Sequence, residues 1–416
     1  MLNITYHNYD SIKSAQSNDQ EFKKLIDSLT SSNNNSTSKI LKEAPPYENL
    51  NRLFSIAEYI KNTFNHVVII GMGGAILNPM AITAFCEKQK EDSIKITYQY
   101  TIEPNNFQEL EKDLDYNKTA FIVISKSGET IETLTLFTLW LKKYKNGNVK
   151  NLKDHFYFIT GKNNNTLRKA AKELNCVIFN HDDINGRYST FSNVGLLPAL
   201  IAGINVKDFC DGARYTLHTF LSDGIHSSAA IGGKFLANMH SKKKNISVIV
   251  SYIYRMLSLL QWQAQILAES SGKKGKGITP IIAMAPIDHH SQLQLYLDGP
   301  KDKFFTLIYD QNLNKNDKEM QNNIDYVLNY KSLDCTLKVV YQAAFQMLKQ
   351  YKLPIRTITL EKLSIKSIGS LMMYFMIETI IFSKLINVNP FNQPSINHMK
   401  NLTSNLLESF DKYQRY

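Results

Sequence analysis

Hydroxyl and amine side chains gather directly after a short apolar stretch in the first third of the chain. The four apolar residues Phe121–Ile124 run into the segment Ser125–Thr130, which reads SKSGET. The apolar run predicts a buried parallel strand, and Thr133–Trp140 downstream predicts a helix. Backbone N–H groups at a helix start attract anions, and hydroxyls and a lysine add donors. The pattern predicts a phosphate loop, with an ordinary N-capped helix as the alternative, since Ser and Thr are favoured caps. The predicted phosphate-binding residues are Ser125, Lys126, Ser127 and Thr130.

A glycine-rich turn precedes this loop in the chain. The apolar run His66–Ile70 leads into Gly71-Met-Gly-Gly74, and an apolar helix is expected to follow. The order of strand, glycine turn and helix is typical of dinucleotide sites, but the third glycine of that fingerprint is missing, because Ile76 stands there. We therefore expect no dinucleotide cofactor. Gly74 still allows a ligand to approach the backbone closely.

The elements that must position these residues alternate between strand and helix. Apolar runs predict strands at 66–70, 93–100, 121–124, 156–159 and 176–179, and again at 245–251, 279–285, 304–309 and 355–360. Helical patterns lie between them, which predicts an α/β fold of two doubly wound parallel sheets. The similar plan of the two halves suggests an internal duplication. The expected domains are a helical segment (1–65), two α/β domains (66–204 and 205–388) and a helical tail (389–416).

Composition restricts the class of protein. Four cysteines without CxxC spacing predict neither a zinc site nor disulfides, and they fit a reduced cytosol. The N-terminus shows no signal-peptide pattern, and the apolar run Leu371–Phe382 contains Glu378, so we expect a buried helix and no membrane association. The net charge of +11 comes from scattered lysines without interleaved aromatics. A lysine-rich solvated surface explains it better than nucleic-acid binding.

Four later segments stand out beside the glycine turn and the phosphate loop. They are Gly186-Arg-Tyr-Ser through Pro198, Gln265-x-x-x-Glu269-Ser-x-Gly-Lys273, Asp288-His-His-Ser291, and Pro390-Phe-Asn-Gln-Pro394 with Lys400. Taken in this order, the six segments resemble the phosphoglucose isomerase family, which is built from two sugar-isomerase (SIS) domains. The resemblance runs from about Val67 to Lys400.

The resemblance implies an enzyme that interconverts glucose 6-phosphate and fructose 6-phosphate without metal or cofactor. Glu269 would be the base that moves a proton between C2 and C1, and Arg187 would stabilise the enediolate. His290 and Lys400 would move protons during ring opening. Gly74, Gln265 and Gln393 would hold the sugar phosphate. The family also implies a homodimer in which the histidine reaches the neighbouring subunit's site.

Each implied role has a plain alternative. Glu269 could be a surface carboxylate and Arg187 a surface arginine, which are the usual positions of these residue types. His289 stands beside His290, so one of the two could be merely solvent-facing. A sugar-phosphate-binding SIS protein that acts as a sensor would keep the phosphate loop without needing the four catalytic residues together. An isomerase that also accepts mannose 6-phosphate is a further alternative.

Four positions depart from the family pattern. Ala75 stands for a serine, Glu129 for a threonine in the phosphate loop, Asn392 for an aspartate and Asn397 for a glutamate. A carboxylate beside a phosphate dianion weakens binding unless it points away, so the orientation of Glu129 matters most. We expect these changes to affect affinity more than the chemical step.

Overall fold

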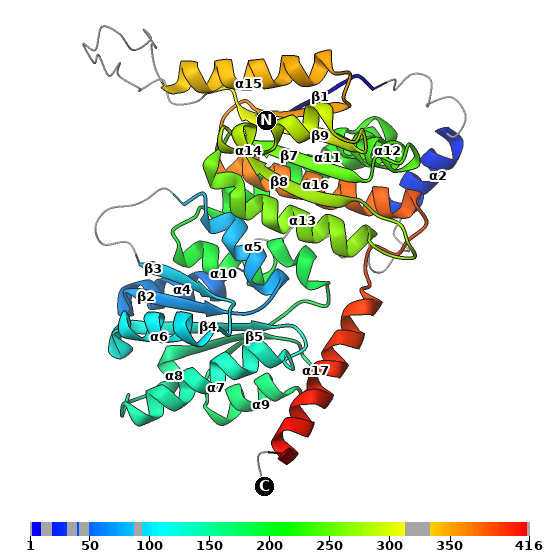
Figure 1. Cartoon of the computed structure of the whole chain (residues 1–416). Coiled ribbons are helices and arrows are strands. Elements are labelled where there is room, and N and C mark those ends of the chain that lie inside the picture. Colours follow the sequence, from blue (N-terminus) through cyan, green and yellow to red (C-terminus); the bar gives the residue numbers. More distant parts are fainter. Residues whose placement is uncertain are drawn as a thin grey trace, which may run out of the picture. The chain divides into compact units, whose positions relative to one another are not determined.

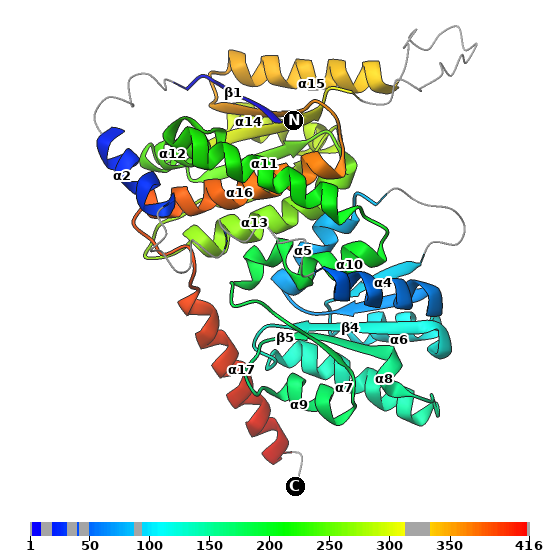
Figure 2. The same ribbon diagram turned by 180° about the vertical axis from the view of Figure 1, so that it is seen from behind.

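The computed structural model describes residues 2–9, 19–30, 40, 50–86, 94–312 and 333–413. The predicted loop 31–38, and the predicted loop 311–318 from residue 313 on, lie outside this part of the chain. The chain forms two compact units (Figures 1 and 2). The first unit comprises Tyr47–Met80, Cys86–Gly203 and Asn389–Tyr416, and the second comprises Met1–Pro46, Ala81–Phe85 and Ile204–Val388. Each unit contains one sheet.

The sheet of the first unit is parallel throughout, with the strand order β3-β2-β4-β5-β6. Its strands are β2 (His66–Ile70), β3 (Lys95–Gln99), β4 (Thr119–Ser125), β5 (Phe156–Thr160) and β6 (Val177–Asn180). Strands β2, β4 and β5 are buried along their whole length, which explains why they are apolar runs without alternation. The predicted doubly wound parallel sheet is confirmed.

Helices cover both faces of this sheet. They are α4 (Asn51–Thr63), α5 (Gly74–Thr83), α6 (Pro104–Lys112), α7 (Ile131–Asn146), α8 (Leu152–His155), α9 (Thr166–Glu173) and α10 (Asn193–Ile201), and α17 (Pro394–Tyr413) follows at the end of the chain. Helices α6 to α9 lie on one face, and α4 and α10 pack together on the other (Figures 1 and 2). This arrangement follows from right-handed crossovers that run in both directions from β2.

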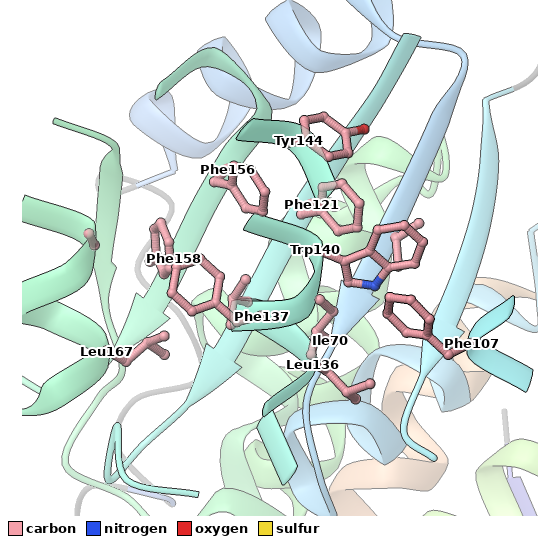
Figure 3. Packing of buried hydrophobic residues seen from close by; sticks show 13 residues of the cluster. Ile70, Phe107, Phe121, Leu136, Phe137, Trp140, Tyr144, Phe156, Phe158 and Leu167 are labelled. Carbon is pink, nitrogen blue, oxygen red and sulfur yellow. The ribbon is translucent and has the colours of Figure 1, made fainter. Parts of the chain in front are cut away.

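An aromatic cluster joins α7 to the sheet (Figure 3). The ring of Trp140 lies 4.5 Å from that of Phe107 and 5.2 Å from that of Phe121, which stacks on Phe156 at 5.0 Å. The indole N–H of Trp140 donates to Oε1 of Gln99 at 2.6 Å, so the buried polar atom has a partner. The cluster holds α7 against β4. Both ends of the loop between β4 and α7 are thereby fixed.

The second unit repeats this plan with one exception. Its strand order is β1-β10-β9-β7-β8, and β7 (Ile246–Ser251), β8 (Thr279–Met284), β9 (Lys303–Asp310) and β10 (Ile355–Leu360) are parallel. The exception is β1 (Leu2–His7), which pairs antiparallel with β10, with Leu2 opposite Leu360. With β7 matched to β2, the parallel strands of the two sheets follow the same order, and β1 takes the edge position that β6 has in the first sheet.

The N-terminal region differs from the prediction, which placed residues 1–65 in a helical segment. Leu2–His7 is a strand, although α2 (Asp19–Thr30) and α4 are helices as predicted. The region is also divided, because residues up to Pro46 belong to the second unit and α4 belongs to the first. The strand has a physical reason: β10 would otherwise present unpaired N–H and C=O groups at an open edge.

Besides α2, the second unit contains the helices α11 (Val206–Asp223), α12 (Ser228–Ser241), α13 (Leu257–Ser271), α14 (Ile287–Asp298), α15 (Leu333–Gln350) and α16 (Ile365–Leu385). Helices α14 and α15 pack in one hydrophobic cluster with strands β7, β9 and β10. By length and composition α16 could cross a membrane, but it packs against α11, α12 and α13, and nearly all its residues are buried. This agrees with the buried helix predicted for Leu371–Phe382.

Candidate active site

The phosphate loop predicted from the sequence is a tight turn whose hydroxyls contact one another. The Ser125 and Thr130 hydroxyl oxygens lie 3.0 Å apart, and those of Ser127 and Thr130 lie 3.5 Å apart. The N–H of Gly128, which has a φ of 69°, donates to Oγ of Ser125 at 3.1 Å. Thr130 precedes the first residue of α7 but makes no side-chain capping bond to it. The ordinary N-cap alternative therefore does not describe this loop.

A second segment supports the loop from behind. The N–H of Gly161 donates to the Lys126 carbonyl at 3.1 Å, and that of Leu167 donates to the Gly128 carbonyl at 3.2 Å. A Cβ on Gly128 would lie 1.9 Å from Oδ1 of Asn165, so only glycine fits there. The loop is held by the residues around the start of α9 as well as by its own hydroxyls.

Glu129 points toward α9. Its carboxylate accepts from the Thr166 N–H at 2.7 Å and from the Thr166 hydroxyl at 2.8 Å. Thr166 is the first residue of α9, so the negative charge lies at the positive end of a helix dipole. The departure from threonine at position 129 is thus accommodated without aiming a carboxylate at the loop hydroxyls.

Lys126 provides the cation of the loop. Its Nζ lies 3.5 Å from Oδ1 of Asp183, and both side chains are substantially exposed. An ion pair of this kind contributes little to stability, because water screens it. An incoming dianion could therefore replace Asp183 at small cost.

Arg187 and Gln393, which the resemblance assigns to one site, are in direct contact. Arg187 lies in the 3-10 helix Gly186–Phe191 and its side chain is buried. Its Nη1 donates to Oε1 of Gln393 at 2.9 Å, and its Nη2 donates to the Pro390 carbonyl at 2.6 Å. The Asn392 carbonyl lies 3.4 Å from Nη2, while the Asn392 side chain is exposed. The guanidinium thus fixes the segment that leads into α17, on which Lys400 is exposed.

Sequence reasoning missed Asn78, which ties the glycine turn to the Arg187 segment. This fully buried side chain donates to the Gly186 carbonyl at 2.7 Å and to Oγ of Ser189 at 3.2 Å, and it accepts from the Thr190 hydroxyl. A Cβ on Gly74 would lie 2.4 Å from the Gly186 carbonyl oxygen, so the two backbones touch. An asparagine inside an otherwise apolar helix was the available signal.

Gln265 and Glu269 lie one turn apart on α13 in the second unit. Nε2 of Gln265 donates to Oε1 of Glu269 at 2.8 Å. Oε1 of Gln265 is buried and has no hydrogen-bond partner among the described residues. The Lys273 ammonium donates to the carbonyls of Glu269 and Ser270, at 2.7 Å and 2.6 Å. It thereby provides hydrogen-bond donors to carbonyls at the C-terminal end of the helix. A partly buried carboxylate with a neighbouring amide can accept a proton from a bound substrate.

His289 and His290 have different surroundings in the first turn of α14. The His289 ring is half-buried, and its Nε2 shares a hydrogen bond of 3.0 Å with the Tyr252 hydroxyl. The His290 side chain is exposed. This difference favours His290 as the histidine that meets a substrate, in line with the resemblance.

The predicted residues fall into two groups. Gly74, the phosphate loop, Arg187, Gln393 and Lys400 belong to the first unit, and Gln265, Glu269 and His290 belong to the second. The first group draws on residues far apart in sequence, whereas the second lies within residues 265–290. The meeting of the two groups around one substrate stays a prediction. No cluster of three or more metal-binding side chains occurs within the described ranges.

Comparisons with known proteins give a consistent result. The sequence profile described as "Phosphoglucose isomerase" matches residues 51–287. The chain is 31% identical over 378 residues to a protein of Methanococcus maripaludis named "Probable glucose-6-phosphate isomerase", covering 88% of this chain and 85% of that one. It is 30% identical over 364 residues to the "Glucose-6-phosphate isomerase" of Methanocaldococcus jannaschii, covering 87% of this chain and 88% of that one.

Solved structures share the fold. A hypothetical protein from Thermus thermophilus superposes with a TM-score of 0.87 at 26% identity, covering 98% of this chain and all of that one. A glucose-6-phosphate isomerase from Chlamydia trachomatis gives a TM-score of 0.81 at 18% identity, covering 99% of this chain and 89% of that one. The profile match, the two relatives and the sheet order lead to one conclusion: this chain belongs to the phosphoglucose isomerase family.

Proposed function

We propose that this chain interconverts glucose 6-phosphate and fructose 6-phosphate. The observation that carries the proposal is the hydroxyl-lined loop between β4 and α7, in a chain whose family profile covers residues 51–287. The loop lies at the carboxyl end of a parallel strand and at a helix N-terminus, which is a favourable place for a phosphate. An aldose phosphate and a ketose phosphate both present this group.

The loop would bind the phosphate, leaving the sugar chain to reach the reacting groups. Hydroxyls of Ser125, Ser127 and Thr130 donate hydrogen bonds, and Lys126 exchanges its exposed partner Asp183 for the dianion. The buried Oε1 of Gln265 can accept from a sugar hydroxyl, which would give that atom a partner. Gly74 and Gln393 would contact the rest of the substrate.

The chemistry begins with ring opening. His290 and Lys400 move a proton from the O1 hydroxyl to the ring oxygen as the bond between C1 and that oxygen breaks, which yields the open-chain aldehyde. Both side chains are exposed in this chain and can therefore reach a ligand. Isomerisation then proceeds on the open chain.

Glu269 acts as the base in the isomerisation step. It removes the proton from C2, the electron pair forms a double bond between C1 and C2, and O1 takes the negative charge of an enediolate. Arg187 stabilises this charge because a guanidinium keeps its proton. A proton passes from O2 to O1, and Glu269 returns its proton to C1, leaving a ketone at C2. No metal or cofactor takes part.

We propose further that the active form is a homodimer whose site is completed at the subunit interface. Large apolar side chains stand exposed at helical spacing along α17, at Ile396, Met399, Leu402, Leu406 and Leu407. An exposed apolar stripe of this kind is typical of protein interfaces. Sedimentation of wild type and of Leu402→Glu tests the dimer, and a monomeric wild type contradicts it.

We place the enzyme in the cytoplasm, acting on a free sugar phosphate and not on nucleic acid or membranes.

A coupled assay on the purified protein tests the proposed activity. Fructose 6-phosphate is offered alongside mannose 6-phosphate and glucosamine 6-phosphate, and glucose 6-phosphate formation is followed with a dehydrogenase. We expect turnover of fructose 6-phosphate, and turnover of mannose 6-phosphate as well would reveal the broader isomerase. Binding of fructose 6-phosphate without turnover contradicts the proposal and favours a sugar-phosphate sensor.

A further inference from the structure

The first turn of α14 is tied to the end of β8 by the side chain of Asp288. One carboxylate oxygen accepts from the Met284 N–H at 2.7 Å, and Met284 is the last residue of β8. The other accepts from the Ser291 hydroxyl at 2.8 Å and from Nε2 of Gln292 at 3.0 Å. The Asp288 carboxylate thus connects the end of β8 to Ser291 and Gln292, the two residues that follow His290 in α14.

Tyr252 holds the same turn from the neighbouring strand. It directly follows β7, is almost fully buried, and shares the 3.0 Å hydrogen bond with Nε2 of His289. The rings of Tyr252 and Tyr341 meet edge to face at 5.1 Å, and the ring of Tyr309 lies 6.3 Å away. The Tyr252 hydroxyl is therefore fixed by packing on β7, β9 and α15 before it meets the histidine.

His290 consequently follows two residues whose side chains are both anchored. Asp288 is bound to β8, and His289 is bound to the residue after β7. In an α-helix, fixing these positions also fixes the direction of the next Cα–Cβ bond. The exposed His290 side chain thus projects from a turn that has little freedom to rotate.

Charge and protonation support this arrangement. Burial would raise the pKa of Asp288, but hydrogen bonds from Met284, Gln292 and Ser291 outweigh it and lower that pKa. Burial lowers the pKa of His289, and so does the neighbouring His290, whereas Asp288 opposes them. At neutral pH the pair is an anchored carboxylate beside a neutral imidazole, and the neutral ring can bond to Tyr252.

We propose that Asp288 and Tyr252 are positioning residues for His290, holding the first turn of α14 so that the imidazole meets the sugar ring oxygen. The inference rests on the proposed function, because it assigns these residues to the ring-opening step. An ordinary helix cap would not explain it, since Asp288 bonds to the N–H of the preceding strand and not to that of its own helix. Neither residue needs to touch the substrate.

The test uses Asp288→Asn and Tyr252→Phe, each alone and combined with His290→Ala. Both changes keep the side-chain volume, and one removes the charge while the other removes the hydroxyl. Asp298→Asn, an exposed residue at the other end of α14, is the matched control. The readouts are kcat and KM for fructose 6-phosphate, and the rate of exchange between the α and β anomers of glucose 6-phosphate, which reports ring opening. Thermal unfolding shows that the variants are folded.

We expect each variant to lower kcat and anomer exchange about tenfold with little change in KM. In the His290→Ala background the same changes should cause no further loss, because residues that act through one group are not additive. If Asp288→Asn or Tyr252→Phe lowers kcat and anomer exchange by the same factor in the His290→Ala background as in wild type, the inference is overturned. So does a wild-type rate in both variants, or an equal loss in Asp298→Asn. A wild type without isomerase activity overturns the proposed function and this inference together, whereas these other results leave the proposed function intact.

Discussion

Several polar side chains of the loop 125–130 form hydrogen bonds that their residue types alone would not predict. The Ser125 and Thr130 hydroxyls bond to each other, and Thr130 makes no capping bond to α7, which fits the proposed phosphate loop better than an ordinary N-cap. Glu129 would repel a phosphate by charge alone, yet its bonds to Thr166 place that charge at a helix start. The type and position of these residues therefore suggest what each could do, and the hydrogen-bond partner in the structure distinguishes between the alternatives.

Lys126 is expected to serve substrate binding and not the chemical step. Lys126→Ala should raise KM for fructose 6-phosphate about tenfold or more and leave kcat nearly unchanged, because a charge-assisted bond to the phosphate is lost. Lys145→Ala removes an exposed lysine from the distal part of α7 and is the control. Steady-state kinetics check the prediction. A loss confined to kcat would show that Lys126 acts on the reacting carbons instead.

Two buried histidines should make the stability of the protein depend on pH. Burial lowers the pKa of His181 and that of His66 to about 4 in each case. The unfolded chain has histidines of ordinary pKa, so it binds more protons than the folded chain between about pH 6.5 and pH 4. Stability is therefore full above this range and falls as the pH drops through it, by up to about 1.4 kcal/mol per pH unit for each histidine.

Urea unfolding at a series of pH values from about 7 to 5 measures this dependence. His181→Gln should flatten the slope, and the exposed His218→Gln should leave it unchanged. An equal slope in wild type and His181→Gln would mean that the pKa of His181 does not differ between the folded and the unfolded chain.

The sequence was informative about residues whose surroundings are local, and less so about the others. Ser125–Thr130 could be interpreted from the strand before it and the helix after it. Asn78 and Asp288 could not be given roles, because their partners lie in other elements: Asn78 bonds to Gly186, and Asp288 to the end of β8. The family resemblance assigned Arg187 and Gln393 to one site, but their direct contact was not predicted, since 206 positions separate them.

The same contrast holds for whole elements. Strands buried on both faces were predictable to within a few residues, because a short continuous apolar run between turn residues is typical of a buried parallel strand. Strand β1 was missed: its residues alternate between half-buried and exposed, and its partner β10 lies at the other end of the chain. Helix α14 was missed as well, since its histidines and glutamines obscure the apolar face that packs on the sheet.

Strand β1 should contribute measurably to the second unit. Removing residues 1–8 takes away the half-buried Leu2, Ile4 and Tyr6 and uncovers the edge of β10. We expect a loss of about 3 kcal/mol in the free energy of unfolding, from three partly buried side chains. Urea denaturation measures the loss, and hydrogen exchange should show faster exchange in β10 than in β4. Unchanged exchange in β10 would mean that β1 adds no protection.

The whole molecule consists of two units with one strand order and different contributions to the chemistry. In each sheet the first parallel strand (β2 or β7) has the next strand (β3 or β8) on one side and the two that follow (β4 and β5, or β9 and β10) on the other. This shared order fits the internal duplication predicted from the sequence. The predicted phosphate loop belongs to the first unit and the proposed base to the second, so the proposed reaction would use residues of both units.

The most direct test of the proposed reaction follows hydrogen exchange with solvent. Fructose 6-phosphate is incubated in D₂O with wild type and with Glu269→Gln, and proton NMR follows deuterium at C1 of the substrate and at C2 of the glucose 6-phosphate formed. We predict turnover with deuterium incorporation by the wild type. Glu269→Gln should bind the substrate with nearly unchanged affinity but give no turnover and no exchange, because an amide keeps the shape of the carboxylate but accepts no proton. Undiminished exchange by Glu269→Gln would contradict the assignment of the base and, with it, the proposed mechanism.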